Sequence, residues 1–236
     1  MEKFTIRKTG LLFIALFSSS ILFAQSSKNL PVKNFSEIGV SSGIDLYLTQ
    51  GSTEQVRLVG DKDLIEKAVV ERSGNGIRIK YRDGFSLSNL FRNKSLKAYV
   101  TYKNISSISA SGGSDVKTEN TLKANKLTLH ASGGSDLDMS IVCRDIEIET
   151  SGGSDVELKG SAANMSLHTS GGSDVDAFDF KVDYAKVNAS GGSDANVYVL
   201  KALEANASGG SDVRYKGTAS YRKTSDSRSG SVTKAD

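Results

Sequence analysis

Apolar and polar positions alternate strictly through the second half of the chain. Before one glycine pair the apolar residues lie two apart, at Leu127, Leu129 and Ala131, and after it the alternation resumes at Leu137 and Met139. Strict alternation is the pattern of strands with one buried and one wet face, whereas a helical leucine-rich repeat would show an apolar stripe at 3.6-residue spacing. The pattern therefore predicts β-strands.

A pentapeptide, Ser-Gly-Gly-Ser-Asp, separates these strands and occurs six times. The copies begin at Ser111, Ser132, Ser151, Ser170, Ser190 and Ser208, and their spacings run from 18 to 21 residues. Self-similarity at this period is typical of a solenoid, in which each repeat is one coil that cannot bury its apolar face alone. Since crossovers between parallel strands are nearly always right-handed, we predict an all-β fold, a parallel right-handed β-helix with coils of about 19 residues.

The chain before the repeats, residues 31–105, has the same alternation without the pentapeptide. A degenerate copy, SSGID, starts at Ser41, and IDLYLTQG, VRLVGD, GIRIKYRDG and LKAYVTY predict four strands, with a turn at SGNG. In DKDLIEKAVV the apolar residues follow helical spacing behind Asp61, which predicts one short helix. We expect this region to cap the end of the solenoid, because an uncovered end exposes unpaired backbone.

The first residues are predicted to be a signal peptide. MEKFTIRKTG is a basic opening, and LLFIALFSSSILF is apolar but too short to span a bilayer. The predicted organisation is a signal peptide over 1–24, a single β-solenoid domain over 31–218, and a polar tail over 219–236 in which SGSVTK forms a closing strand. The repeat coils occupy 106–218 of that domain. We expect an exported protein of the periplasm, the outer cell surface or the extracellular space, with no transmembrane span in the mature chain.

Charge and cysteine content narrow the function classes. The 236 residues carry 30 Lys plus Arg and 27 Asp plus Glu, and removal of residues 1–24 leaves 27 basic against 26 acidic groups. This balance predicts no nucleic-acid partner. Cys143 is the only cysteine, so neither an intrachain disulfide nor a lipid anchor near the cleavage point is available.

The repeated pentapeptide predicts a structural turn ladder. If strands run through it, alternation places Ser111, Gly113 and Asp115 outside and Gly112 and Ser114 in phase with the core. Glycine suits a sharp corner, and Ser and Asp accept hydrogen bonds from nearby backbone. The predicted ladder comprises Gly112, Asp115, Gly133, Asp136, Gly152, Asp155, Gly171, Asp174, Gly191, Asp194, Gly209 and Asp212.

Stacked aspartates repel one another, which raises the question of a cation. Carboxylates about 4.8 Å apart repel by about 0.9 kcal/mol even at the dielectric of bulk water. Either backbone and serine donors hold each carboxylate or cations lie between coils. On three successive coils a second carboxylate follows two residues later, which makes a grid of Asp136, Asp138, Asp155, Glu157, Asp174 and Asp176. Oxygen ligands suit Ca²⁺, so this grid is the candidate metal site, while the turn ladder remains the favoured interpretation and no other cofactor is expected.

A second column could hold zinc. Two residues before the pentapeptides stand Ser109, His130, Glu149, His168, Asn188 and Asn206. The two histidines would be two coils, roughly 9.6 Å, apart at their backbones, so a solvated strand face explains the column better than a zinc site.

The strands interrupted by SGGSD, the lead-in SSGIDLYLTQG, the segment VRLVGDKDLIEKAVVERSGNGIRIKY and the export signal together resemble the auto-transporter adhesin head GIN domain family of Bacteroidetes-type bacteria. The resemblance covers residues 32–232. It implies a β-helical, non-enzymatic protein of the cell envelope or the medium.

Two functional classes follow. The first is an adhesin-like binding module whose partner is a surface glycan or an envelope protein; the second is a structural envelope component, or a solenoid stabilised by calcium. A polysaccharide-active β-helix enzyme fits worst, because the short uniform coils offer no long loops to build a cleft and SGGSD lacks the nucleophile-elbow pattern.

Overall fold

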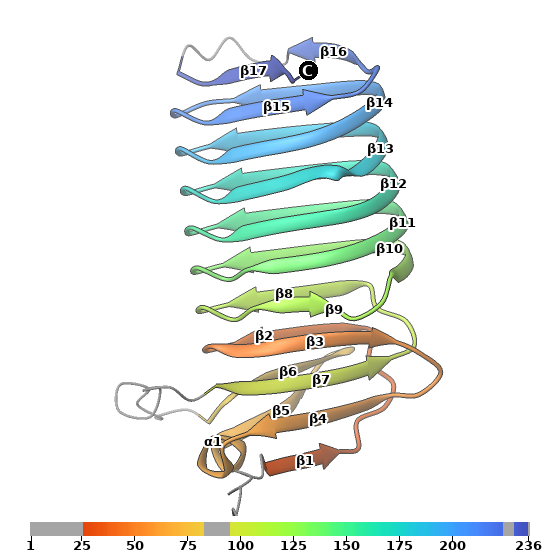
Figure 1. The fold of residues 1–236 in the computed structure, drawn as a ribbon, viewed down its shortest axis with the longest axis vertical. Coiled ribbons are helices and arrows are strands. Elements are labelled where there is room, and N and C mark those ends of the chain that lie inside the picture. The colour runs from red at the N-terminus through yellow and green to blue at the C-terminus, as the bar shows by residue number, and fades with distance from the viewer. Residues whose placement is uncertain (1–25, 83–94, 224–228, 236) are drawn as a thin grey trace, which may run out of the picture.

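The computed structural model describes residues 26–82, 95–223 and 229–235, and these form a β-solenoid. Figure 1 shows a stack of coils, each with one strand on each of two faces and a tight turn along one edge. The predicted fold class is thereby confirmed. The predicted signal peptide, residues 1–24, lies outside the described residues.

The described elements follow the chain in this order: β1 (Ser26–Leu30), β2 (Glu37–Ser41), β3 (Ile44–Gln50), β4 (Gln55–Gly60), α1 (Lys62–Lys67), β5 (Ala68–Ser73), β6 (Gly76–Tyr81), β7 (Leu96–Tyr102), β8 (Ser107–Ser111), β9 (Val116–Thr118), β10 (Leu122–Ser132), β11 (Leu137–Ser151), β12 (Asp155–Ser170), β13 (Asp174–Ser190), β14 (Asp194–Ala207), β15 (Asp212–Lys216), β16 (Ser220–Lys223) and β17 (Ser231–Lys234). The strands β11 to β14 are long because each bends around the edge opposite the tight turns and so belongs to both faces (Figure 1).

The core is a set of apolar columns between the two faces. Parallel pairing places Leu129 beside Ile148, Ile148 beside Leu167 and Leu167 beside Val187, and all four side chains are fully buried. Burying a side chain of this size stabilises the fold by about 1.5–3 kcal/mol. Because one coil stacks on the next, the period-two pattern of the sequence becomes a continuous core along the solenoid.

The amino-terminal end changes to antiparallel pairing. The strand β4 pairs antiparallel with both β1 and β7, and β5 pairs antiparallel with β6. The helix α1 packs beside β1 and β4 and buries Leu64 and Ile65, and the Asp61 side chain caps it by accepting the backbone N–H of Asp63 at 3.0 Å. The predicted helix and its cap are present, and they close the end of the stack.

The degenerate copy of the repeat stacks directly on the first full copy. The strands β2 and β3 pair with β8 and β9, and the backbone N–H of Ser42 donates to the carbonyl of Ser111 at 3.3 Å. Residues 70 apart in the sequence are therefore neighbours in the same ladder.

The pentapeptide is a turn between the two faces and not a continuous strand. Strand structure ends at Ser111 and resumes at Val116, and Gly112 is exposed instead of lying in phase with the core. The reason is that Gly112 and Gly113 both adopt left-handed backbone angles, φ of 63° and 71°, which reverse the chain. Ser114 does point inward, as the alternation predicted.

The last coil continues both faces. The strand β16 pairs in parallel with β14, and β17 pairs in parallel with β15. In the part of the chain that the structure describes, no helix has the length and apolarity to cross a membrane.

Candidate functional site

The aspartates of the pentapeptides form one column on the face that carries β3, β7 and β9. Pairing places Asp155 beside Asp174, Asp174 beside Asp194 and Asp194 beside Asp212. At the other end Asp45 extends the column and lies beside Lys97. We call this set, Asp45, Asp115, Asp136, Asp155, Asp174, Asp194 and Asp212, the aspartate column.

Backbone and serine donors offset part of the repulsion in this column. The backbone N–H of Asp136 donates to the Asp115 carboxylate, and that of Asp212 donates to Asp194 Oδ1 at 3.3 Å. At the carboxyl end, Ser231 Oγ donates to Asp212 Oδ1 at 2.6 Å. Partial burial and the neighbouring Asp136 carboxylate still raise the pKa of Asp115. The protein's own donors therefore hold Asp115, Asp194 and Asp212 of this column, at some electrostatic cost.

The predicted metal ligands line one shallow groove. Asp138 pairs with Glu157 and Glu157 pairs with Asp176, next to the aspartate column. The groove has a volume of about 310 Å³, and its lining is Asp136, Leu137, Asp138, Asp155, Val156, Glu157, Asp174 and Asp176. The structure thus brings all six predicted carboxylates together; we call this the acidic groove.

Two lysines already engage this groove. Lys117 Nζ lies 2.7 Å from Asp138 Oδ2, and Lys159 Nζ lies 2.6 Å from Glu157 Oε1. Within the described residues, no group of three or more His, Cys, Asp or Glu side chains has the arrangement to hold a metal ion. The calcium site stays a prediction.

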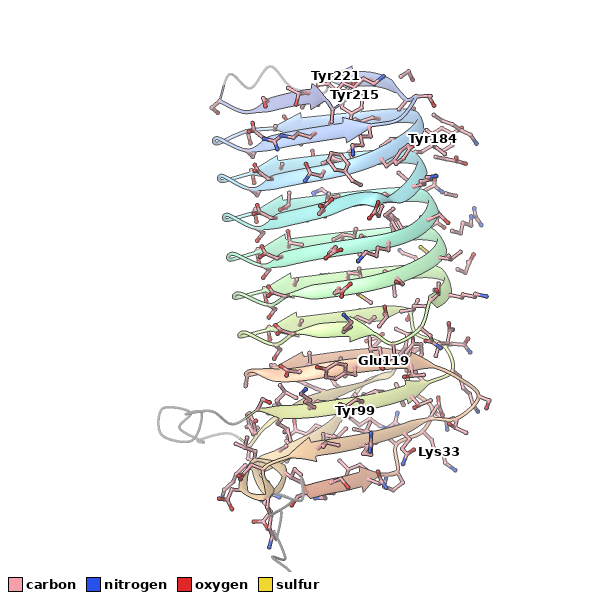
Figure 2. All side chains as sticks on the ribbon, viewed as in Figure 1. Lys33, Tyr99, Glu119, Tyr184, Tyr215 and Tyr221 are labelled. Atoms are coloured by element: carbon pink, nitrogen blue, oxygen red, sulfur yellow. The ribbon has the colours of Figure 1, made fainter. Side chains whose placement is uncertain are left out.

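Beside the aspartate column runs a second column on the same face, Lys117, Asp138, Glu157 and Asp176. Aromatic and basic residues that the sequence pattern had not singled out extend it toward the amino-terminal end. Tyr47 lies beside Lys117 and stacks on Tyr99, with ring centroids 4.9 Å apart, and the Arg57 guanidinium lies 4.8 Å from the Tyr99 ring centroid. Figure 2 shows Tyr99 on this part of the solenoid. The spacing could have placed Tyr47 in this column, because Tyr47 follows Asp45 by two residues, as Lys117 follows Asp115.

The histidine column forms on the opposite face as predicted. His130 lies beside Glu149, and Glu149 lies beside His168. His130 Nδ1 is 3.0 Å from Glu149 Oε2, and both side chains are about half exposed. A polar groove of about 480 Å³ runs along these residues and Asn188. The half-exposed side chains of His130 and Glu149 agree with the solvated strand face that the spacing favoured over a zinc site.

The two glycines of each turn have different constraints. A Cβ on Gly152 would lie 3.1 Å from the backbone nitrogen of Gly133 on the adjacent coil, whereas a Cβ on Gly153 would meet nothing within 4 Å. Both have left-handed φ angles, 72° and 76°. The first glycine is therefore needed for the close approach of coils as well as for its backbone angle, and the second only for its backbone angle.

A buried column of serines, absent from the predicted turn ladder, connects the turns. The second serine of every pentapeptide is fully buried: Ser114, Ser135, Ser154, Ser173, Ser193 and Ser211. The backbone N–H of Ser114 donates to Ser135 Oγ at 3.2 Å, and that of Ser135 donates to Ser154 Oγ at 3.3 Å. These bonds satisfy backbone groups that the tight turns would otherwise leave without partners.

The fold and these columns define a class: a parallel β-solenoid with flat faces of stacked polar side chains. The chain belongs to the family described as "Putative auto-transporter adhesin, head GIN domain", whose model matches residues 34–219. No curated protein sequence matches the chain.

Solved structures share the fold. A "putative adhesin" from Bacteroides fragilis is 20% identical, with a TM-score of 0.79, and the match covers 89% of this chain and 97% of that one. A "putative adhesin" from Parabacteroides distasonis is 21% identical, with a TM-score of 0.69 and coverages of 89% and 97%. A "putative lipid binding protein" from the same species is 18% identical, with a TM-score of 0.70 and coverages of 90% and 97%. At these identities the likeness concerns the fold alone.

Proposed function

We propose that this protein is a non-enzymatic, adhesin-like binding module that is exported and acts at the cell envelope or outside the cell. The single observation that carries the proposal is the polar face formed by two neighbouring columns. These are the aspartate column and the column of Lys117, Asp138, Glu157 and Asp176. Parallel register repeats these columns from coil to coil, so a partner with a regular surface can be contacted at several coils at once.

Membership of an adhesin family supports a binding role over an enzymatic one. The chemistry of the acidic groove agrees with this, because the groove is shallow and Asp138 and Glu157 are already paired with lysines. A general acid or base must reach a bound substrate with a free proton-transfer group, and catalytic sites are usually built in concave pockets. The export signal expected over residues 1–24 supports the location.

The test is to locate the protein in intact cells. Surface biotinylation of cells that carry the full chain, followed by fractionation and pull-down with the purified protein, should label the protein from outside and recover a partner from the envelope or the medium. A periplasmic protein of the same cells serves as the control for leakage. Recovery of the protein in the cytoplasmic fraction would overturn the proposal.

The acidic groove supports a second candidate role, a solenoid stabilised by a bound cation. Six carboxylates line the groove, and oxygen ligands suit Ca²⁺. Lys117 and Lys159 compete with a cation for two of them. If the role is real, millimolar Ca²⁺ raises the melting temperature and Asp155→Asn removes the increase. An unchanged melting temperature eliminates this role.

A further inference from the structure

A third hollow lies near the carboxyl end of the solenoid, on the face opposite the acidic groove. Tyr184 on β13 lies beside Ala202 on β14, and Ala202 lies beside Ser220 on β16. These three residues line a hollow of about 520 Å³. Figure 2 places Tyr184 and Tyr221 at this end of the stack.

The Tyr184 ring forms one wall of the hollow and is held in position. Its relative exposure is 49%, which is high for so large an apolar side chain. Lys201 Nζ lies 5.4 Å from the ring centroid and is anchored 2.8 Å from Asp183 Oδ2. Lys201 does not line the hollow, so the ring surface that borders the hollow stays open.

Charged side chains form the other wall. Lys186 lies beside Glu204, and Glu204 lies beside Arg222. Lys186 Nζ is 3.6 Å from Glu204 Oε1, so these two charges largely neutralise each other. The exposed Arg222 guanidinium then leaves this wall with a net positive charge.

We propose that this hollow binds a sugar that carries a carboxylate, such as a uronic or sialic acid residue of a glycan. A tyrosine ring offers an apolar surface with a polar rim, which suits the mixed apolar and polar face of a sugar ring. The planar guanidinium of Arg222 recognises a carboxylate in a bidentate manner. This inference rests on the proposed binding function and names its ligand class.

The surroundings favour a sugar over a protein partner. Among the described residues, the large apolar side chains with such exposure are Val142, Tyr184, Leu200 and Tyr221. Of these, Tyr184 and Tyr221 line the hollow, together with polar and charged groups. A protein interface would present a broader contiguous apolar patch.

Saturation-transfer difference NMR with the full chain tests the proposal, with glucuronic acid and N-acetylneuraminic acid as probes and glucose as the neutral comparison. We expect signals from at least one acidic sugar and weaker signals from glucose. Tyr184→Ala and Arg222→Gln should each lower the affinity about tenfold, which corresponds to about 1.4 kcal/mol. The two substitutions remove different exposed side chains of the hollow. If both variants lose affinity for the acidic sugar while their melting temperatures stay unchanged, the hollow is the binding site.

Tyr198→Ala is the matched control. Tyr198 lies on β14, on the opposite face, and is also covered by a lysine, with Lys181 Nζ 5.5 Å from its ring centroid. This variant should bind like the wild type. No signal from either acidic sugar, equal signals from glucose, or equal losses in Tyr198→Ala and Tyr184→Ala would overturn the inference. The proposed adhesin-like function would survive these results if the protein still mediated attachment of cells, because that assay does not depend on this hollow.

Discussion

The backbone N–H of Ser154 donates to Ser173 Oγ at 3.1 Å, and both residues are fully buried although they belong to different coils. The bond runs along the solenoid axis and repeats in the neighbouring turns. A buried donor without a partner costs about 1–3 kcal/mol. The serine column therefore explains why the pentapeptide has a second serine as well as two glycines.

Ser173→Ala should destabilise the fold by about 1–3 kcal/mol, because it leaves the buried Ser154 N–H without its acceptor. Urea denaturation measures this loss. Ser166→Ala is the control, since Ser166 lies on β12, the strand between these two turns, and is only partly buried. Equal stability of the two variants would contradict a structural role for the serine column.

The two glycines of one turn should differ in their tolerance of a side chain. Gly152→Ala and Gly153→Ala both pay about 1–2 kcal/mol for a left-handed backbone. Gly152→Ala should lose more stability, because its Cβ would also press on the Gly133 backbone. Thermal denaturation of both variants should therefore give the lower melting temperature for Gly152→Ala. The reverse order would show that coil spacing is not the constraint.

Asp115→Asn should stabilise the protein at neutral pH. Burial and the Asp136 carboxylate raise the pKa of Asp115 above its ordinary value, so the ionised form is disfavoured in the folded state. The favourable contribution of the protonated Asp115 carboxyl to the free energy of unfolding is fully present below the ordinary pKa. It is lost as the pH rises through the raised pKa. We expect a gain below about 1 kcal/mol near pH 7, because water screens this carboxylate, and no gain near pH 3.

Urea denaturation of Asp115→Asn near pH 7 and near pH 3 checks whether the gain in stability occurs only at the higher pH. Glu119→Gln is the control, because Glu119 is an exposed carboxylate on the same coil but outside the aspartate column (Figure 2). A gain of equal size at both pH values would mean that the effect does not come from ionisation of Asp115.

Cys143 should react slowly with thiol reagents in the folded protein. Burial, together with the nearby Asp145 carboxylate, raises the pKa of the Cys143 thiol to about 11. The thiolate is the reactive form, so at about pH 8 only a very small fraction is available. The rate of reaction with Ellman's reagent should rise strongly when urea unfolds the chain. Equal rates before and after unfolding would contradict this environment.

The sequence was sufficient to predict the coils because alternation and the repeat act at short range. The position of Leu129 opposite Ile148 follows from the 19 residues that separate them. The capping helix followed from Asp61 and the apolar spacing behind it. The acidic groove followed from the same register arithmetic.

The features of the fold and the site that were not predicted depend on contacts between segments far apart in the sequence or on backbone and side-chain conformations. The antiparallel pairing of β4 with β7 joins segments separated by the 83–94 region, and the stacking of Ser42 on Ser111 spans about 70 residues. The exposed position of Gly112 comes from two consecutive left-handed residues, which interrupt the alternation that continuous strands would keep. Lys117 lies opposite Asp138 by the same register. The contact of Lys159 with Glu157, two residues away on one strand, depends on side-chain rotamers, which spacing does not fix.

Retention of cells under flow tests the central claim, an adhesin-like role, most directly. Native cells with and without the full chain are passed over a glycan-coated surface, and the attached cells are counted. The account predicts that loss of the protein lowers attachment severalfold and that the wild-type chain restores it. Unchanged attachment without the protein, on glycan, protein and abiotic surfaces alike, would contradict the account.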